Sequence, residues 1–264
     1  MSFSVFETVR QFGDDALAYS SLLPNISYFR YKNGFIPYVD SRHYGWAKKL
    51  FPLAYPIAVL GEPMIAKSDK RACLSAFIHR YPKAAFFHIG SDTASYLNAR
   101  GYYVNAMGLE NNILLNEFND SIHAHPAIKE GARKALKETV HVYEDRFESF
   151  SMSLLKKITK SWCLSRTHPS EKQHFFTPPF PLYSEPDVRY FFAFHNTRLI
   201  GFRRFEPIYH QGHIYGYYAN QTRVDSYAPS GTDYLLLFEA IRVFKGEQKK
   251  SAKHQYYFTK AIRF

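Results

Sequence analysis

Short apolar runs rich in β-branched and aromatic residues alternate along this chain with stretches of helical periodicity, and this alternation restricts the fold most. Residues 57–60 (Ile-Ala-Val-Leu) are typical of a buried strand, and residues 68–81 after them place Cys73, Leu74 and Phe77 on one helical face. Helices that follow strands in this way pack against the faces of a sheet. We therefore expect an α/β or α+β protein in which mixed β-sheets are flanked by helices.

Local signals predict where the first elements begin and turn. Ser4 followed by Glu7 is a capping box, which predicts a short helix. Asn33-Gly34 between two β-rich runs predicts a hairpin. Pro37 in the second of these runs lacks an amide hydrogen, so we expect its strand to lie at a sheet edge or near a bulge.

The remaining elements follow from the same rules. Expected helices cover residues 15–23, 92–101, 126–137, 151–164 and 232–245, and expected strands cover residues 26–31, 35–39, 84–89, 102–107, 111–115, 140–144, 188–195, 199–206 and 213–223. Residues 168–187 are rich in proline and aromatic residues and predict a loop. We expect two halves, residues 1–119 and residues 120–264, each with its own mixed sheet.

The charge of the chain favours a polyanionic partner. Lysine and arginine number 34 against 23 aspartate and glutamate residues, which gives a formal net charge of +11. This excess favours attraction to nucleic acid or to an anionic membrane surface, and a merely basic globular protein is the alternative. The two cysteines, Cys73 and Cys163, make no disulfide framework, which favours a cytoplasmic location.

No segment predicts a membrane anchor. The N-terminal residues lack a basic region followed by an apolar one, and the most apolar run, residues 51–66, is interrupted by three prolines. We therefore expect a soluble protein without a transmembrane span. Any membrane contact is expected to be peripheral, at the inner face of the membrane.

Motifs for several kinds of chemistry are absent from the sequence. The twelve histidines include no H-E-x-x-H pair, neither cysteine has a C-x-x-C partner, and no G-x-S-x-G, Walker or G-x-G-x-x-G motif occurs. His123 and His125, two residues apart in an expected loop, are a weak metal candidate. We therefore expect no metal and no bound cofactor.

Two clusters of polar residues lie where strands are expected to end. Glu62 could hold an amine there or could simply complete a strand-to-helix turn. Arg223 ends a later strand, and Gly231-Thr232-Asp233 opens the next helix. An arginine near the free amides of a helix start suits a phosphate or a developing oxyanion, and a capped helix beside a surface arginine is the alternative.

A third cluster is a basic helix. Its cations, which are spaced three to four residues apart, are Lys129, Arg133, Lys134 and Lys137. This spacing places several of them within one helical turn of each other. They form either a contact for a polyanion or a solvated helix face.

A series of short motifs resembles one known family. In chain order the motifs are residues 59–63 (Val-Leu-Gly-Glu-Pro), 96–102 (Tyr-Leu-Asn-Ala-Arg-Gly-Tyr), 108–110 (Gly-Leu-Glu), the basic helix and 142–144 (Val-Tyr-Glu), 161–164 (Ser-Trp-Cys-Leu), 199–202 (Leu-Ile-Gly-Phe), 216–223 (Gly-Tyr-Tyr-Ala-Asn-Gln-Thr-Arg) and 228–235 (Ala-Pro-Ser-Gly-Thr-Asp-Tyr-Leu). As an ordered series over about residues 12–248, they are similar to the family named for the C-terminal domain of phosphatidylglycerol lysyltransferases.

The resemblance implies a fold, an activity and a set of site residues. It implies two GNAT-like halves and transfer of an aminoacyl group from aminoacyl-tRNA to an acceptor, which is phosphatidylglycerol in the best-known members. Catalytic roles are implied for Arg223, Asn220 and Thr232. Substrate-binding roles are implied for Glu62 and Glu110, which would hold the incoming amine, and for Gly231, Asp233 and Trp162, and contacts with tRNA phosphates are implied for Lys129, Arg133, Lys134 and Lys137.

Three features depart from the family pattern. The large transmembrane domain usual in lysyltransferases is absent from this sequence, so the chain resembles a stand-alone relative. Lysyltransferases tend to carry aspartate at the position of Asn220, and its absence removes a base or a charge partner for Arg223. The tail from Gln248 to Phe258 does not match the final strand of the relatives, so we expect the second half to be incomplete if that strand is missing.

Two other functions remain open at this point. One is an acyl-CoA-dependent N-acyltransferase, although the usual pyrophosphate-binding loop of those enzymes is not found. The other is a non-catalytic relative that binds polyanions, and its affinity would fall steeply with salt.

Overall fold

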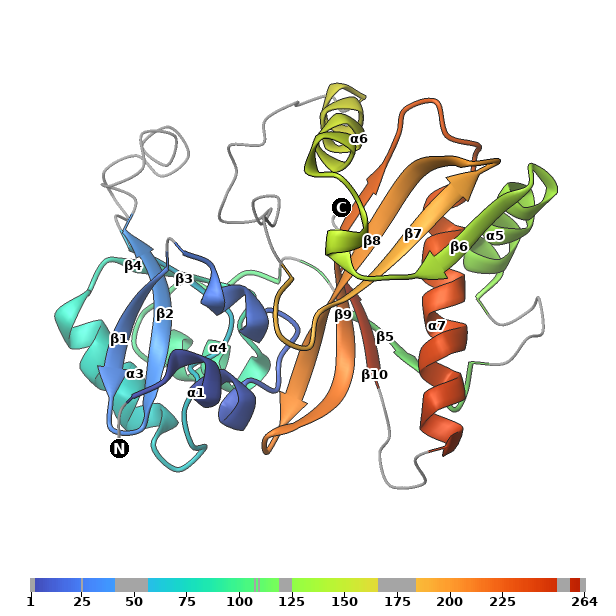
Figure 1. Ribbon diagram of the computed structural model, residues 1–264. Coiled ribbons are helices and arrows are strands. Elements are labelled where there is room, and N and C mark those ends of the chain that lie inside the picture. The colour runs from blue at the N-terminus through green and yellow to red at the C-terminus, as the bar shows by residue number, and fades with distance from the viewer. Residues whose placement is uncertain are drawn as a thin grey trace. The chain divides into compact units, whose positions relative to one another are not determined.

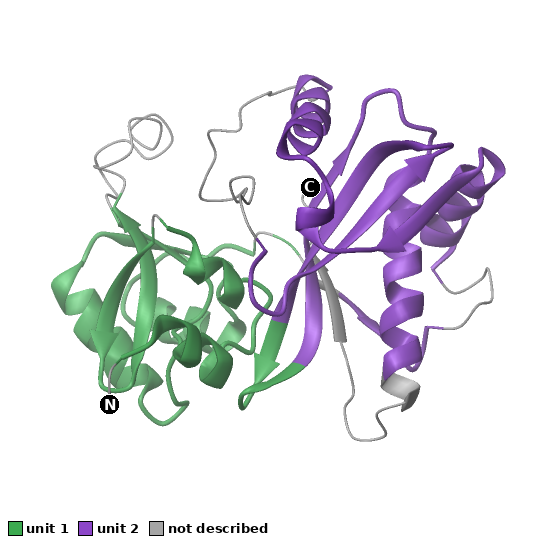
Figure 2. Ribbon diagram, viewed as in Figure 1, with its two compact units in different colours: residues 1–109, 208–214, 263–264 green, residues 110–207, 215–262 purple. Residues whose placement is uncertain are grey.

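The computed structural model describes residues 3–24, 26–40, 57–106, 108, 110–118, 125–165, 184–250 and 257–261 (Figure 1). The chain divides into two compact units (Figure 2), and each is described by itself. Unit 1 comprises Met1–Leu109, Ile208–Ile214 and Arg263–Phe264, and unit 2 comprises Glu110–Pro207 and Tyr215–Ile262. None of the helices in the described ranges is both long enough and apolar enough to span a bilayer.

Unit 1 is built on a four-stranded mixed sheet with the strand order β1-β2-β3-β4. Its strands are β1 (Ser27–Tyr31), β2 (Gly34–Asp40), β3 (Ile57–Leu60) and β4 (Ala84–Phe87), and its helices are α1 (Val5–Phe12), the 3-10 helix η1 (Ala18–Leu22), α3 (Lys70–Arg80) and α4 (Ser91–Asn98). The first three strands are antiparallel, whereas β3 and β4 are parallel and are connected through α3. The predicted hairpin and the predicted helix after β3 are both confirmed.

Phe77 lies at the centre of the unit 1 core. It is fully buried on α3, and Cys73 and Leu74 are buried on the same face, as the periodicity predicted. Its ring packs edge-on against Phe29 of β1, with 5.3 Å between ring centroids, and against Phe86 of β4, with 5.8 Å. Burial of such a side chain contributes about 2 kcal/mol, so this ring fixes α3 on the sheet.

Pro37 lies on an inner strand, so the prediction of an edge strand is wrong. Pro37 pairs with Tyr28 of β1, whereas the pairing of β2 with β3 covers only residues 38–40. The position without an amide hydrogen therefore lies outside the paired stretch, so no hydrogen bond to β3 is lost.

Two other predicted elements take different forms. Residues 102–106 are not a strand, although Gly101 before them has the positive φ, 85°, expected after a helix. Residues 15–23 form a turn and the 3-10 helix η1 in place of the expected α-helix. The loop expected at residues 168–187 lies mostly outside the described residues.

Unit 2 is built on a six-stranded mixed sheet with the strand order β5-β10-β9-β8-β7-β6. Its strands are β5 (Glu110–Leu114), β6 (Val140–Glu144), β7 (Arg189–His195), β8 (Arg198–His210), β9 (His213–Val224) and β10 (Tyr257–Ala261), and its helices are α5 (Pro126–Lys137), the 3-10 helix η3 (Phe147–Ser149), α6 (Met152–Leu164) and α7 (Thr232–Lys250). The predicted three-stranded meander is confirmed as β7, β8 and β9.

The first and last strands of unit 2 differ from the expectation. β5, which was assigned to the first half, pairs with β10 in the second sheet. β10 comes from the tail that departs from the family pattern, and it also pairs in parallel with β9. The tail, which does not match the family pattern, therefore supplies a strand to the second sheet. Pairing between segments so far apart in the sequence leaves no local pattern that could reveal it.

Helices α6 and α7 cover opposite faces of the second sheet (Figure 1). Phe202 of β8 packs with Leu155 and Ile158 of α6. Phe205, also on β8, packs edge-on against Phe244 of α7, with 5.4 Å between ring centroids. Positions 202 and 205 point to opposite faces because successive strand residues alternate. Both faces are thus covered, and nearly all of β8 is buried.

A half-buried carboxylate supports the turn after β3 in unit 1. Asp15 accepts a hydrogen bond from the backbone N–H of Leu17 (2.7 Å) and another from that of Glu62 (3.4 Å). Burial, and to a smaller extent the negative charge of Glu62, raises the pKa of Asp15 to about 7, although these two hydrogen bonds act in the opposite direction. Asp15 is therefore protonated in the folded protein under mildly acidic conditions.

This pKa predicts a pH dependence of stability. Because the folded protein holds the proton of Asp15 more tightly than the unfolded chain, whose aspartate titrates near 3.8, the free energy of unfolding should fall as pH rises from about 4 to about 7. Substitution Asp15→Asn should remove the contribution of Asp15 to this pH dependence. Urea unfolding at pH 5 and pH 8 measures the free energy of unfolding at the two pH values. The control is Asp14→Asn, at an exposed position. An unchanged difference between the two pH values in Asp15→Asn would show that this carboxylate is ionised throughout.

Candidate functional site

Arg223, at the end of β9, meets α6 through Trp162. Its side chain is only 6% exposed, and the guanidinium carbon lies 3.9 Å from the centroid of the Trp162 ring. Its Nη1 donates a hydrogen bond to the carbonyl oxygen of Thr222 (3.3 Å). Two motifs that are distant in the sequence, residues 161–164 and 216–223, therefore meet around a cation–π contact.

Asp225 fixes this contact. Its carboxylate accepts hydrogen bonds from the hydroxyl of Ser161 (2.9 Å) and from the backbone N–H of Tyr227 (3.2 Å), and it forms an ion pair with Arg198 (2.6 Å). Burial alone would raise the pKa of Asp225, but these three donors outweigh burial and hold it below its ordinary value. Asp225 is thus an ionised anchor that holds the residues around Trp162 beside the end of β9.

Gly231 and Thr232 form a close packing contact between α5 and α7. Gly231 has a φ of 87°, and a Cβ at this position would lie 2.0 Å from the carbonyl oxygen of Gly131 in α5. The Thr232 hydroxyl is buried and donates to the carbonyl oxygen of Pro229 (2.6 Å). These contacts account for both residues as parts of the helix start, and their expected role at an oxyanion remains a prediction.

Arg203 of β8 is the guanidinium group that reaches the start of α7, and the sequence analysis missed it. Its side chain is 6% exposed, and its Nη1 donates to the carbonyl oxygen of Asp233 (3.1 Å). Burial lowers the pKa of Arg203 to about 10, with a smaller opposing effect of the Asp233 charge, so the group stays cationic at neutral pH. Among the described residues it forms no ion pair. Nothing in its local sequence distinguishes it from other arginines.

The neighbouring residue Arg204, on the same strand, has a charge that is neutralised by ion pairs. Its guanidinium group forms ion pairs of 2.6 Å with Glu185 and with Glu206. All three side chains lie in the interior of unit 2, and burial raises the pKa of Glu185 despite the favourable charge of Arg204. Arg204 is therefore neutralised within the protein, whereas Arg203 beside it carries a positive charge towards a helix start.

Glu62, expected to hold a substrate amine, is engaged by donors within unit 1. Its two carboxylate oxygens accept hydrogen bonds from the backbone N–H of Gly90 (2.5 Å) and from the hydroxyl of Thr93 (2.6 Å), at the start of α4. The ammonium group of Lys70 lies 2.6 Å from it. The amine that Glu62 holds in this structure is that of a lysine in α3, and binding of a substrate amine remains a prediction.

The basic helix is α5, and its four cations do not share one environment. Arg133 is exposed and pairs with Glu130 (2.9 Å), and Lys134 and Lys137 are exposed as well. Lys129, by contrast, is 7% exposed, and its ammonium group lies 5.2 Å from the centroid of the Phe118 ring. The expectation that Lys129 belongs to an exposed cationic face is therefore wrong, because α5 turns this position towards the interior.

The remaining predicted residues lie apart from one another in the fold. Asn220 is partly buried on β9, three residues before Arg223. Asp233 is exposed in the first turn of α7, where a negative charge suits the helix dipole. Glu110 begins β5, and its side chain lies outside the described part of the structure.

The contrast between Arg203 and Arg204 predicts opposite effects on stability. Substitution Arg203→Met should leave the free energy of unfolding within about 1 kcal/mol or raise it, because it removes a buried charge that forms no ion pair with any residue the structure describes. Substitution Arg204→Met should lower it by about 3–5 kcal/mol, because Glu185 and Glu206 are then buried without their cation. Urea unfolding measures both. Equal losses in the two variants would mean that Arg203 is also compensated within the fold.

The packing of Gly231 predicts a steric effect. Substitution Gly231→Ala should lower the free energy of unfolding by about 2–4 kcal/mol, because it combines an unfavourable φ with a clash against α5. Gly101→Ala is the matched control, since Gly101 has a similar φ of 85° but no atom within 4 Å of the added Cβ. Thermal unfolding of both variants measures the difference, and equal losses would rule out the clash.

Comparisons with known proteins agree with this architecture. The structure of L-PGS from Bacillus licheniformis matches over 98% of this chain and 77% of that chain, with 15% identity and a TM-score of 0.71. The C-terminal domain of a putative lysylphosphatidylglycerol synthetase from Agrobacterium fabrum matches over 97% and 78%, with 14% identity and a TM-score of 0.68. A conserved protein of unknown function from Bacteroides thetaiotaomicron matches over 98% and 88%, with 11% identity and a TM-score of 0.59.

These likenesses confirm the predicted fold class, two GNAT-like halves built on mixed sheets flanked by helices. A sequence search of curated proteins found no match. The sequence profile of the family described as phosphatidylglycerol lysyltransferase, C-terminal, matches residues 6–252. This match covers nearly the whole chain, and the chain therefore belongs to the phosphatidylglycerol lysyltransferase C-terminal family.

Proposed function

We propose that this protein transfers an aminoacyl group from aminoacyl-tRNA to the hydroxyl or amine of an acceptor, with an anionic lipid of the phosphatidylglycerol kind as the first acceptor to test. Family membership supports the reaction class. The formal net charge of +11 favours both an RNA donor and peripheral contact with an anionic membrane. The cysteine usage favours work in the cytoplasm.

The observation that carries this proposal is the buried cation Arg203 at the start of α7. Burial of a guanidinium group without an ion-pair partner is unfavourable for folding. A charge kept at this cost is typical of a functional site. The arrangement suits negative charge that comes from a substrate, either a phosphate or the oxyanion of a reaction intermediate.

The reaction requires little covalent chemistry from the protein. The acceptor oxygen or nitrogen attacks the carbonyl carbon of the aminoacyl ester and forms a new ester or amide bond. Collapse of the tetrahedral intermediate breaks the bond to the terminal ribose oxygen of the tRNA, which takes up the proton that the acceptor loses. Because the ester is already activated, the protein acts by holding the two substrates together and by stabilising the oxyanion.

In this scheme Arg203 of β8 supplies positive charge at the start of α7. Arg223 of the neighbouring strand β9 lies on the opposite, α6 face of the sheet, against Trp162. Trp162 and Asp225 act as positioning residues, since they hold Arg223 and the end of β9 in place. Asn220, three residues before Arg223 on β9, has a carboxamide side chain. A carboxamide cannot serve as a base, so the scheme assigns the acceptor proton directly to the departing ribose oxygen.

A transfer assay tests the proposal. The protein is mixed with a full set of aminoacyl-tRNAs and with vesicles that contain phosphatidylglycerol, and the aminoacylated lipid is measured. Removal of one oxyanion donor costs about 100-fold in rate, so Arg203→Met should lower transfer by about that factor. The control is Lys160→Ala, an exposed cation of α6 close to Trp162, which should retain full transfer.

Folding of each variant is checked by thermal unfolding, so that a loss of rate is not confused with a loss of structure. Absence of transfer with every aminoacyl-tRNA, to lipid vesicles and to amine acceptors alike, would reject the proposal. RNA binding that weakens with salt in a protein without transfer would instead identify a non-catalytic relative that binds polyanions.

A further inference from the structure

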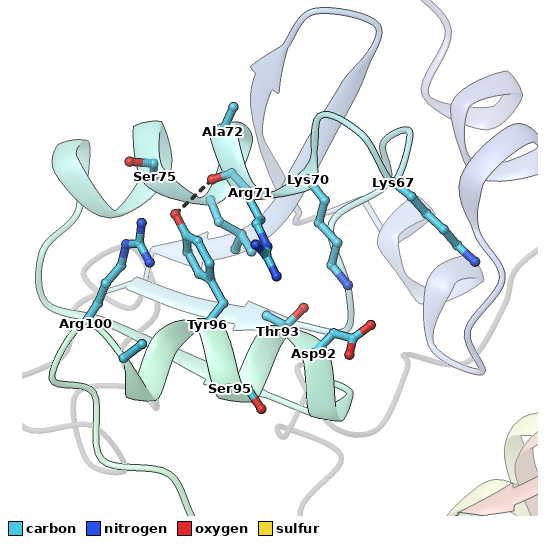
Figure 3. Close-up of a pocket in the computed structure, with 12 residues that line it drawn as sticks. Lys67, Lys70, Arg71, Ala72, Ser75, Asp92, Thr93, Ser95, Tyr96 and Arg100 are labelled. Carbon is cyan, nitrogen blue, oxygen red and sulfur yellow. Dashed lines mark hydrogen bonds between the residues drawn. The ribbon is translucent and has the colours of Figure 1, made fainter.

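A basic groove runs between α3 and α4 in unit 1 (Figure 3). Its volume is about 820 Å³. The charged and aromatic residues on its walls are Lys67, Lys70, Arg71, Asp92, Tyr96 and Arg100. Lys70 and Arg71 extend from the start of α3 towards α4, and Arg100 lies beside Tyr96. Tyr96 and Arg100 belong to the motif of residues 96–102, which the site in unit 2 leaves without a role.

The cations of this groove are only partly compensated. Lys70 forms an ion pair with Glu62. Lys67, Arg71 and Arg100 form no ion pair with any described residue, and all three are exposed. The first turn of α3 carries no acidic residue, and the carboxylate of its N-cap, Asp69, is paired with Lys32. Positive side chains therefore gather at the positive end of a helix dipole. The groove therefore attracts an anion supplied from outside the described residues.

The aromatic side of the groove adds a flat surface to this charge. The guanidinium carbon of Arg100 lies 3.6 Å from the centroid of the Tyr96 ring. The Tyr96 hydroxyl donates a hydrogen bond to the backbone carbonyl oxygen of Arg71 (2.9 Å), which ties α4 to α3 and fixes the ring. A guanidinium plane held on an aromatic ring is a surface on which an unpaired nucleobase can stack.

We propose that this groove binds a single-stranded segment of RNA, with Lys67 and Arg71 at backbone phosphates and Arg100 against a base. The inference deepens the proposed function and rests on it for the identity of the RNA, which is the tRNA of the donor. It places an RNA contact on unit 1, whereas the sequence analysis expected it on α5. There, Lys129 is buried and Arg133 is already paired with Glu130.

The chemistry of the walls favours RNA over a membrane surface. The groove is concave, and its exposed hydroxyls are those of Ser75 and Ser95, which can bond phosphate or ribose oxygens. Its apolar residues are two alanines and the buried Leu74. Peripheral membrane binding uses large exposed apolar side chains that enter the lipid, and the walls of this groove carry none.

The binding test uses the full chain and a fluorescent single-stranded RNA of twelve nucleotides, with anisotropy measured over a range of salt concentrations. The double variant Arg71→Ala, Arg100→Ala should bind at least about tenfold more weakly. Loss of the phosphate contact of Arg71 should also reduce the slope of log affinity against log salt by about 0.7. The matched control is Lys156→Ala, Lys157→Ala on α6, which removes two exposed cations and should retain the affinity.

A charge-preserving variant separates charge from stacking. Arg71→Lys, Arg100→Lys should keep the salt dependence of the native protein and lose at least about fivefold in affinity, because stacking on a base is worth about 1 kcal/mol or more. Thermal unfolding checks that these variants fold, and Lys67→Ala, which changes an exposed side chain, serves as a further test of the phosphate contact.

Three results would overturn the inference. One is a loss of RNA affinity in the α6 control equal to that of the groove variant. Another is a larger loss of RNA affinity in Lys134→Ala, Lys137→Ala on α5. The third is unchanged RNA binding with a loss of binding to phosphatidylglycerol vesicles. RNA binding that depends on the groove, in a protein without any aminoacyl transfer, would support the RNA-binding groove and reject the proposed function. Failure of one proposal can thus be distinguished from failure of the other.

Discussion

Compensation of positive charge is the constraint on which the interior of this protein depends. Arg204 is neutralised by Glu185 and Glu206 inside unit 2. Asp225 is kept ionised by Ser161 of α6, by Arg198 at the start of β8 and by the backbone N–H of Tyr227. These charges serve the fold because their partners lie within it. Arg203 has no such ion pair in the described chain, and this difference separates a structural arginine from a candidate for binding substrate.

The same distinction applies to unit 1. Glu62 accepts hydrogen bonds from the start of α4 and pairs with Lys70 of α3, so it connects a strand end to two helices. Its carboxylate is thereby occupied, whereas Lys67, Arg71 and Arg100 form no ion pair within the described part of the chain. A position that is central to the local structure can thus look like a ligand site in the sequence, although the anion-attracting surface lies next to it.

Close packing of the α7 and α5 backbones is a second constraint on the structure of unit 2. The start of α7 approaches α5 so closely at Gly231 that only a residue without a side chain fits. Phe244 of the same helix is buried against Phe205 of β8. A helix held in this way, by backbone contact at one end and ring packing along its length, presents its first turn to Arg203 in a fixed position. Such preorganisation is what stabilisation of a developing charge requires.

The sequence by itself determined the helices and strands with strong local signals. The capping box at Ser4, the hairpin around Asn33 and the apolar face of α3 were predicted, because hydrophobic periodicity and turn chemistry act over a few residues. The sequence also placed Trp162 and Arg223 among the site residues through their motifs. Only the tertiary structure decided that β5 pairs with β10, that Lys129 is buried and that Arg203 meets α7. The reason is physical: strand pairing, burial and charge compensation depend on residues far apart in the chain, and a local pattern carries no information about which of them will meet.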